Sequence, residues 1–103
     1  MYPVTYLPVA ERDLSEAIDY IANKINAPAA ARSLLTEYEK TVQRIAEFPY
    51  ACELYRTDRP MRDEIRMAHI KNYILYYAVF PDLVEIRRFI HAQRVRDEVC
   101  EDQ

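Results

Sequence analysis

The feature that most constrains the fold is an almost wholly apolar run near the end of the chain, residues Tyr73–Phe80. The run is rich in aromatic residues and far too short to span a membrane, which is typical of a strand buried on both faces. Pro81-Asp82 interrupts it, and proline suits the first central position of a tight turn. Leu83–Ile90 then returns as a strand that carries charged residues. The pattern predicts a buried β-hairpin, preceded by a further strand at residues 64–70.

Two amphipathic helices are predicted upstream, at about residues 9–26 and 28–48. Apolar residues recur at steps of three and four along both segments, which is the period of an α-helix. Pro8 can open the first helix and Pro28 the second, because proline is tolerated in the first helical turn. A linker of about three residues predicts that the two helices pack as an antiparallel hairpin.

A short β-prone segment at residues 2–7 precedes the helices and has no hairpin partner in the sequence. We expect it to join the strands at 64–70, 73–80 and 83–91 in one antiparallel sheet. The predicted fold class is α+β, in the order β-α-α-β-β-β: an N-terminal strand, a helical hairpin and a three-stranded antiparallel meander. The length of 103 residues and an apolar content of 50% favour a single domain over residues 1–103. The side chains expected to be buried are Ile18, Ile21, Leu35, Tyr38, Val42, Leu75, Val79, Ile86 and Ile90.

Composition excludes several classes of function. The chain contains no glycine, which rules out the glycine-rich phosphate loops of nucleotide-binding proteins. Its turns must form without glycine, and Asn72 is the predicted left-handed residue. Cys52 and Cys100 lack the spacing of metal ligands, and His69 has no carboxylate or cysteine at ligand spacing, so we expect no metal and no cofactor. With no secretion signal and no membrane-spanning run, both cysteines are expected to be free thiols in the cytoplasm.

Charge is distributed unevenly along the chain. The formal net charge is −3, yet residues 54–96 carry nine basic and five acidic side chains. Nucleic-acid binders usually show a basic excess over the whole domain, whereas this chain shows it only locally. An anionic partner is one interpretation of these arginines. The other is a solvated face with internal salt bridges.

Several short motifs resemble the RelE/ParE superfamily of type II toxins. They are AERDL at Ala10–Leu14, APAAA at Ala27–Ala31, Pro49 after the second helix, NYILYY at Asn72–Tyr77 and IHAQR at Ile90–Arg94. Their order and spacing extend the resemblance over about residues 2–96. The resemblance implies a small bacterial toxin, active in the cytoplasm, that a cognate antitoxin neutralises.

The superfamily has two main activities, and they need different residues. RelE-like members cleave messenger RNA on the ribosome, which needs cations for a crowded phosphate together with an acid and a base. On this resemblance the catalytic residues would be Arg66, His91 and Arg94. However, Ile65 and Met67 stand where the family places cations, and Ile74 stands where an arginine is often found.

ParE-like members resemble these in fold but poison DNA gyrase by binding it. Three features favour this branch: the motif Asn72–Tyr77, the His91 ending and the acidic net charge. A ribosome-dependent nuclease is the alternative interpretation, and a non-toxic member of the fold is the third. We expect an antitoxin segment to dock on apolar surface left open by the helical hairpin, and a homodimer would cover the same surface in its absence. An acidic antitoxin would meet a rim formed by residues 56–66 or 87–96. The residues predicted to bind a target or antitoxin are Arg62, Arg66, Arg87, Arg94 and Arg96.

Overall fold

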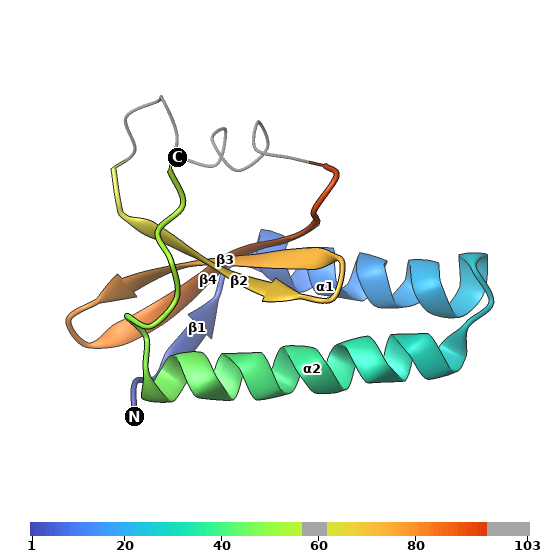
Figure 1. The fold of residues 1–103 in the computed structure, drawn as a ribbon, viewed down its shortest axis with the longest axis horizontal. Helices are drawn as coiled ribbons and strands as arrows, with labels where there is room; N and C mark the ends of the chain where they lie inside the picture. The colour runs from blue at the N-terminus through green and yellow to red at the C-terminus, as the bar shows by residue number, and fades with distance from the viewer. Residues whose placement is uncertain (57–61, 95–103) are drawn as a thin grey trace.

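The computed structural model describes residues 1–56 and 62–94, and the predicted order of elements is confirmed. Arg96 and Cys100 lie outside the described residues. The four strands form one sheet, and Figure 1 shows the longer helix beneath it. Side chains of both helices belong to one apolar cluster with the same face of this sheet. The elements are β1 (Val4–Tyr6), α1 (Pro8–Asp19), η1 (Tyr20–Lys24), α2 (Pro28–Glu47), β2 (Ile65–Ile70), β3 (Tyr73–Phe80) and β4 (Leu83–His91).

Prolines begin both helices, as predicted, because each lies in a first helical turn where its missing N–H needs no partner. The first helix differs from the prediction in its last turns, where η1 is a π-helix that continues α1. The Ile25 N–H donates to the Tyr20 carbonyl five residues back, at 3.0 Å. Each residue of this wider turn advances by a smaller angle than in an α-helix, so Ile25 leaves the apolar stripe and is exposed. Asn26 then ends the helix in the left-handed region, with φ of 63°.

The sheet order is β1-β4-β3-β2. The predicted meander of β2, β3 and β4 is antiparallel, as expected, but the prediction of a wholly antiparallel sheet is wrong, because β1 pairs with β4 in parallel. The N-terminal strand has no tight turn to reverse it. Its direction is set by the helical hairpin, which returns the chain so that the Tyr2 N–H bonds the Ala46 carbonyl at 2.9 Å.

Two local features of the sheet were not predicted. The left-handed residue of the β2–β3 turn is Lys71, with φ of 54°, and not Asn72. In a two-residue hairpin loop of type II′, the residue with positive φ is the first of the two loop residues, which here is Lys71. The β3–β4 register also shifts between Tyr76 and Tyr77, where Arg87 is the extra residue of a β-bulge.

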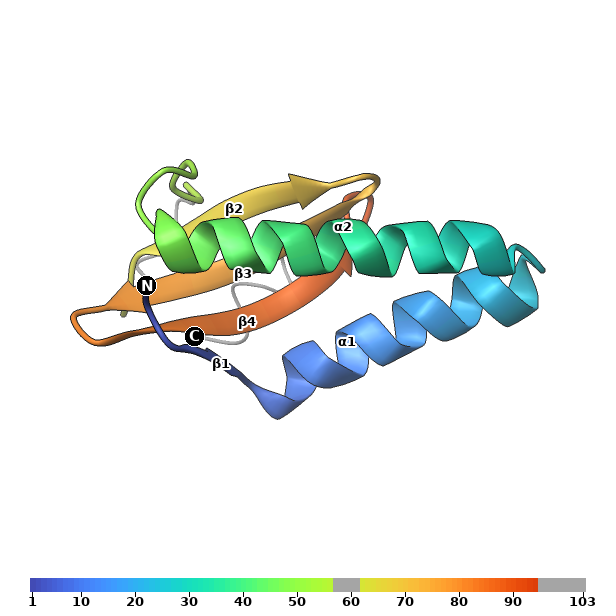
Figure 2. The same cartoon turned by 90° about the horizontal axis from the view of Figure 1, so that it is seen from below.

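The main core lies between the helices and the sheet. Figure 2, seen from the helix side, shows α2 running across the sheet while α1 lies along β4. Leu34 and Tyr38 of α2 pack here against Leu75 of β3 and Phe89 of β4, and the Tyr38 and Phe89 rings meet edge to face with centroids 5.0 Å apart. A smaller apolar cluster covers the other face of the sheet, which we call the open face: Ile65, Tyr76, Ala78 and Ile90.

The predicted core is largely correct. Tyr38, Leu75, Ile86 and Ile90 are buried, and Ile18, Ile21, Val42 and Val79 are half-buried. Leu35 is the exception at 37% exposed. Its neighbour Leu34 takes the inward position, and the next residue of an α-helix is rotated by about 100° away from it.

Candidate functional site

The end of β4 is the first place where predicted site residues meet. His91 is the last residue of β4 and lies opposite Tyr73. The two rings meet edge to face, with centroids 5.1 Å apart. The turn that follows is tied back to the imidazole, because the Gln93 N–H donates to His91 Nδ1 at 3.2 Å. The Arg94 N–H donates to the His91 carbonyl at 2.9 Å. His91 and Arg94 are therefore held together by local backbone geometry.

These two residues line a pocket of about 470 Å³, which we call the β4-end pocket. Its floor is aromatic: Tyr73 stacks on Phe89 with ring centroids 4.9 Å apart and planes at 14°. Burial raises the pKa of the Tyr73 hydroxyl, and the nearby Tyr20 raises it further. The helix side of the pocket consists of Asp13, Glu16, Ala17 and Tyr20.

Asp13 has a structural role at the rim of this pocket. Its carboxylate accepts hydrogen bonds from Arg88 Nε at 2.8 Å and Arg88 Nη2 at 3.2 Å. It also accepts the backbone N–H of Phe89 at 3.0 Å. Because β1 pairs with β4 only as far as Ile86, this N–H would otherwise lie at an unpaired strand edge. Asp13 thus closes the edge of β4 beyond β1, and sequence reasoning missed it because its partners lie about 75 positions away along the chain.

Arg66 belongs to a different part of the molecule. It shares the helix side of β2 with Ala68 and Ile70, and its Nη1 donates to the Cys52 carbonyl at 2.7 Å and the Tyr50 carbonyl at 3.3 Å. Its guanidinium carbon also lies 5.2 Å from the centre of the Tyr50 ring. Arg66 therefore fastens the segment after α2 to the edge of the sheet. The same segment pairs with β2 through an isolated bridge between Leu54 and Arg66.

The register fixes the separation of Arg66 from His91. Arg66 lies opposite Tyr77 of β3 and His91 lies opposite Tyr73, four residues away on the same strand. With about 3.3 Å per residue and about 4.8 Å between strands, their backbones are about 16 Å apart. The structure therefore brings His91 and Arg94 together and leaves Arg66 outside their pocket.

The open face carries apolar side chains at the positions where the nuclease pattern has cations. Ile65 belongs to its buried cluster, and Met67 and Ile74 pack against that cluster. Ile74 is paired with Ile90 of β4, and Met67 with Tyr76 of β3. An uncharged apolar side chain can neither neutralise a phosphate nor transfer a proton, so Ile65, Met67 and Ile74 offer no group for phosphate chemistry.

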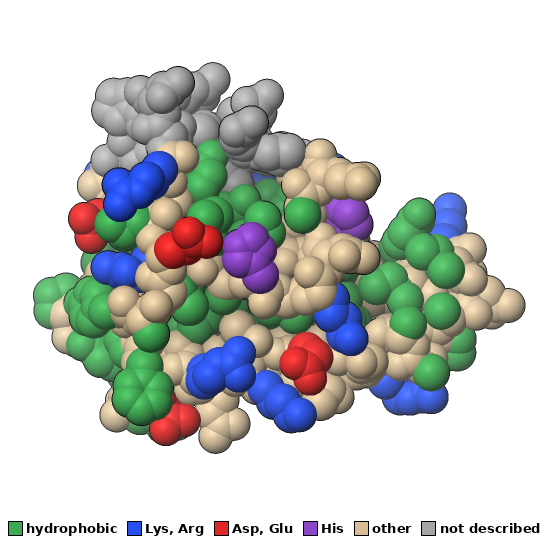
Figure 3. Space-filling view, in the orientation of Figure 1, with side chains coloured by type: hydrophobic (Ala, Val, Ile, Leu, Met, Phe, Trp, Pro, Cys, Tyr) green, Lys and Arg blue, Asp and Glu red, His purple; other side chains and the backbone are tan. Residues whose placement is uncertain are grey.

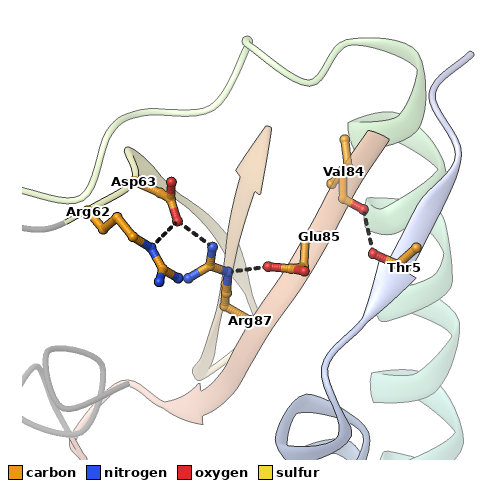
Figure 4. A network of polar contacts seen from close by, with 6 residues as sticks. All are labelled: Thr5, Arg62, Asp63, Val84, Glu85 and Arg87. Carbon is orange, nitrogen blue, oxygen red and sulfur yellow. Dashed lines mark hydrogen bonds and ion pairs between the residues drawn. The ribbon is translucent and has the colours of Figure 1, made fainter. Parts of the chain in front are cut away.

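Arg87 is held inside the molecule. It is 5% exposed, and its Nη2 lies 2.8 Å from Asp63 Oδ2 (Figure 4). Its Nε lies 2.7 Å from Glu85 Oε1, an ion pair without the geometry of a directed hydrogen bond. The hydrogen bond from Arg87 holds the pKa of the Asp63 carboxyl below its usual value, and Arg62 lowers it further. Arg62 itself is largely exposed, so of this pair only Arg62 presents its charge to a partner.

The surface charges do not form one field. Figure 3 shows acidic and basic side chains interspersed over one face of the molecule, with hydrophobic side chains gathered over the tip of the helix pair. Among residues 1–56 and 62–94, no three histidine, cysteine or carboxylate side chains are grouped so as to hold a metal ion. In the same residues, neither helix is long and apolar enough to cross a membrane. Cys52 is a free thiol.

Comparison with known proteins gives one family match. The family model for the ParE toxin of the type II toxin–antitoxin system parDE matches residues 4–96. The curated proteins contain no match.

Solved structures share the fold. A chain of the chromosomal ParDE TA system from P. aeruginosa superposes with a TM-score of 0.70 and 14% identity, over 88% of this chain and 96% of that one. A chain of the E. coli DinJ–YafQ toxin–antitoxin complex gives a TM-score of 0.61 and 12% identity, over 91% and 96% of the two chains. YafQ from E. coli strain BL21(DE3) gives 0.52 and 15% identity, over 90% and 96%. At these identities the likeness shows a common fold alone.

Proposed function

The chain belongs to the ParE family of type II toxins, and on that premise we propose that it arrests its host by binding DNA gyrase. It is the toxin component of a type II toxin–antitoxin system. Its target would lie in the cytoplasm. Inhibition would need a toxin surface complementary to gyrase, and the toxin would catalyse no reaction.

The observation that carries this proposal is the dispersal of the residues that a nuclease would need. Arg66 is fixed to the Tyr50 and Cys52 carbonyls, about 16 Å along the sheet from His91. Ile74 is part of the apolar open face. General acid–base catalysis requires the acting groups to be within hydrogen-bond reach of one substrate. A surface without that arrangement supports inhibition by binding.

The basic residues suited to contact the target are those with exposed charge. Arg62 and Arg94 are exposed, so we propose them as contacts for gyrase or for the antitoxin. Arg66 and Arg87 are committed to partners within the chain and would contribute by holding its shape.

We further propose that a cognate antitoxin covers the helical hairpin. The similar structures include a ParDE system and a DinJ–YafQ complex, in which a toxin is solved with its antitoxin. The hairpin leaves the large apolar side chains of Tyr20, Ile25 and Leu35 exposed. Figure 3 shows hydrophobic side chains gathered over the tip of the helix pair, and exposed apolar patches often mark interaction sites. In the absence of the antitoxin, a homodimer that covers the exposed Tyr20 and Ile25 is the alternative state.

Expression in a bacterial host tests both parts of the proposal. Induction of the toxin alone should trigger the DNA-damage response and filamentation before protein synthesis falls, and expression of the neighbouring antitoxin gene should restore growth. His91→Ala should be as toxic as the wild type. An immediate arrest of translation with cut messages, lost in His91→Ala, would overturn the gyrase proposal.

A ribosome-dependent nuclease is the second candidate because His91 and Arg94 line one pocket together with Tyr73. A histidine can act as a general acid or base near neutral pH. Arg94 could hold a phosphate in the same pocket. Against this candidate stand the distance to Arg66 and the hydrocarbon side chain of Ile74.

A further inference from the structure

The outer side of the helical hairpin contains a groove that none of the site residues above accounts for. Two adjoining hollows of about 360 and 410 Å³ share Leu14, Ser15 and Leu35 in their linings, so they form one continuous interhelical groove. Figure 2 shows why it exists: α1 and α2 meet at their connecting loop and separate toward β1. The groove runs from Tyr6 at its wide end to Asn23 at its narrow end.

The groove has an apolar floor and an acidic rim. Leu14, Ile18 and Ala22 follow one another at four-residue steps along the first helix and form the floor with Leu35. The rim carries the carboxylates of Glu11 and Asp19 on one helix and Glu39 on the other. The described lining contains no lysine or arginine.

These carboxylates are not neutralised within the described part of the chain. The ion pairs found there involve other acidic residues, and Asp19 accepts only the side-chain amide of Asn23, at 2.7 Å. The local field is negative: burial raises the pKa of the Tyr6 hydroxyl, and Glu11 and Glu39 raise it further. Burial also raises the pKa of Tyr38 at the base of the groove, with smaller contributions from Tyr6, Asp13 and Glu11.

We propose that the interhelical groove binds a basic, amphipathic helix of the cognate antitoxin, and that Glu11, Asp19 and Glu39 select lysine or arginine side chains on that helix. The inference rests on the proposed toxin function and adds the chemistry of its partner. Glu11 and Asp19 are eight residues apart on one helix face, about 12 Å. The partner helix should therefore carry basic residues about two turns apart, beside an apolar stripe that meets Leu14, Ile18 and Leu35.

Charge argues against a second copy of the chain as the occupant. In a two-fold dimer the same patch lies on both sides of the interface, so carboxylates would face carboxylates. Like charges placed together at an interface are unfavourable. An acidic antitoxin segment would meet the same repulsion here. Of the arginines expected to receive such a segment, Arg87 lies buried in an ion pair within the chain, and the exposed Arg62 and Arg94 line neither hollow of the groove.

The test compares two variants with the same change of charge. Glu11→Gln/Asp19→Asn/Glu39→Gln neutralises the groove, and Glu47→Gln/Glu64→Gln/Asp82→Asn neutralises three exposed carboxylates outside it. Each is titrated with the purified product of the neighbouring antitoxin gene. The groove variant should bind about tenfold more weakly than wild type at low salt, since three partly exposed ion pairs each contribute a few tenths to about 1 kcal/mol. The control variant should bind within about twofold of wild type.

Salt and toxicity separate this inference from other failures. The deficit of the groove variant should shrink at about 500 mM salt, where exposed charges are screened. In cells the groove variant should stay toxic but be less well neutralised by the antitoxin, whereas a misfolded protein would lose toxicity. If wild type and groove variant bind equally, or the variant binds more tightly, the inference is wrong while the toxin function stands. If wild type forms no complex at all, the antitoxin proposal itself fails.

Discussion

Replacing Asp13 by alanine is expected to lower the free energy of unfolding by about 3 kcal/mol. The substitution removes the carboxylate that accepts Arg88 Nε at 2.8 Å and the Phe89 N–H at 3.0 Å. Removing one partner of a buried ion pair typically costs about 3–5 kcal/mol, and an unsatisfied buried donor costs about 1–3 kcal/mol. We take the lower end of the first range, because each side chain of the pair is 10% exposed and Arg88 makes other contacts.

Urea denaturation of wild type, Asp13→Ala and Asp13→Asn measures this effect. Asparagine keeps an acceptor for the Phe89 N–H but removes the charge, so Asp13→Asn should lose about half as much stability as Asp13→Ala. Glu16→Ala is the matched control, because Glu16 is an exposed carboxylate on the same rim of the β4-end pocket and makes no described ion pair. Its effect should be within about 0.5 kcal/mol of zero.

The same variants show whether Asp13 acts in structure or in chemistry. If Asp13→Ala unfolds at the same urea concentration as wild type, the closure of the β4 edge is not a source of stability and the reasoning is refuted. If Asp13→Asn keeps its stability but loses toxicity, the carboxylate serves a reaction or a target contact instead.

Three further predictions concern stability. Leu34→Ala should cost about 2–5 kcal/mol in urea denaturation because Leu34 is fully buried, while the exposed Leu35→Ala should cost less than about 1 kcal/mol, and equal losses would contradict the assigned helix faces. Tyr77→Phe removes the buried hydrogen bond from the Tyr77 hydroxyl to the Pro49 carbonyl at 2.9 Å and should lower the free energy of unfolding by about 1 kcal/mol, whereas unchanged stability would count against that bond. The lowered pKa of Asp63 means that its carboxylate stabilises the fold above about pH 4, a contribution lost as the pH falls through the folded-state value, so Asp63→Asn should flatten the acid side of a pH–stability profile.

Most of the fold could be predicted because it rests on local patterns. The prolines at positions 8 and 28 mark both helix starts, and the apolar run Tyr73–Phe80 marks the central hairpin. The parallel pairing of β1 could not be predicted, because it depends on where the helical hairpin returns the chain. The residue types at positions 2–7 suit a parallel and an antiparallel strand equally. The left-handed Lys71 was missed because residue type favoured Asn72, whereas the turn type set the position.

The candidate site was predictable only where its residues are close in sequence. His91 and Arg94 belong to one motif and line one pocket. The ion pair between Arg87 and Asp63 joins residues 24 positions apart, and the pair between Arg88 and Asp13 joins residues 75 positions apart. The position of Arg87 also depends on the β-bulge in β4. No count of charges along the chain distinguishes an arginine that faces solvent from one buried in an internal ion pair.

Purified DNA gyrase provides the most direct test of the central claim. The wild-type toxin should inhibit supercoiling of a relaxed plasmid or trap gyrase on cut DNA, prior addition of the antitoxin should prevent this, and His91→Ala should inhibit as strongly as wild type. A ribosomal translation reaction with a defined message should proceed without site-specific cleavage. If gyrase keeps full activity while the message is cut in the ribosome and His91→Ala abolishes the cut, the toxin acts as a nuclease and the account is contradicted.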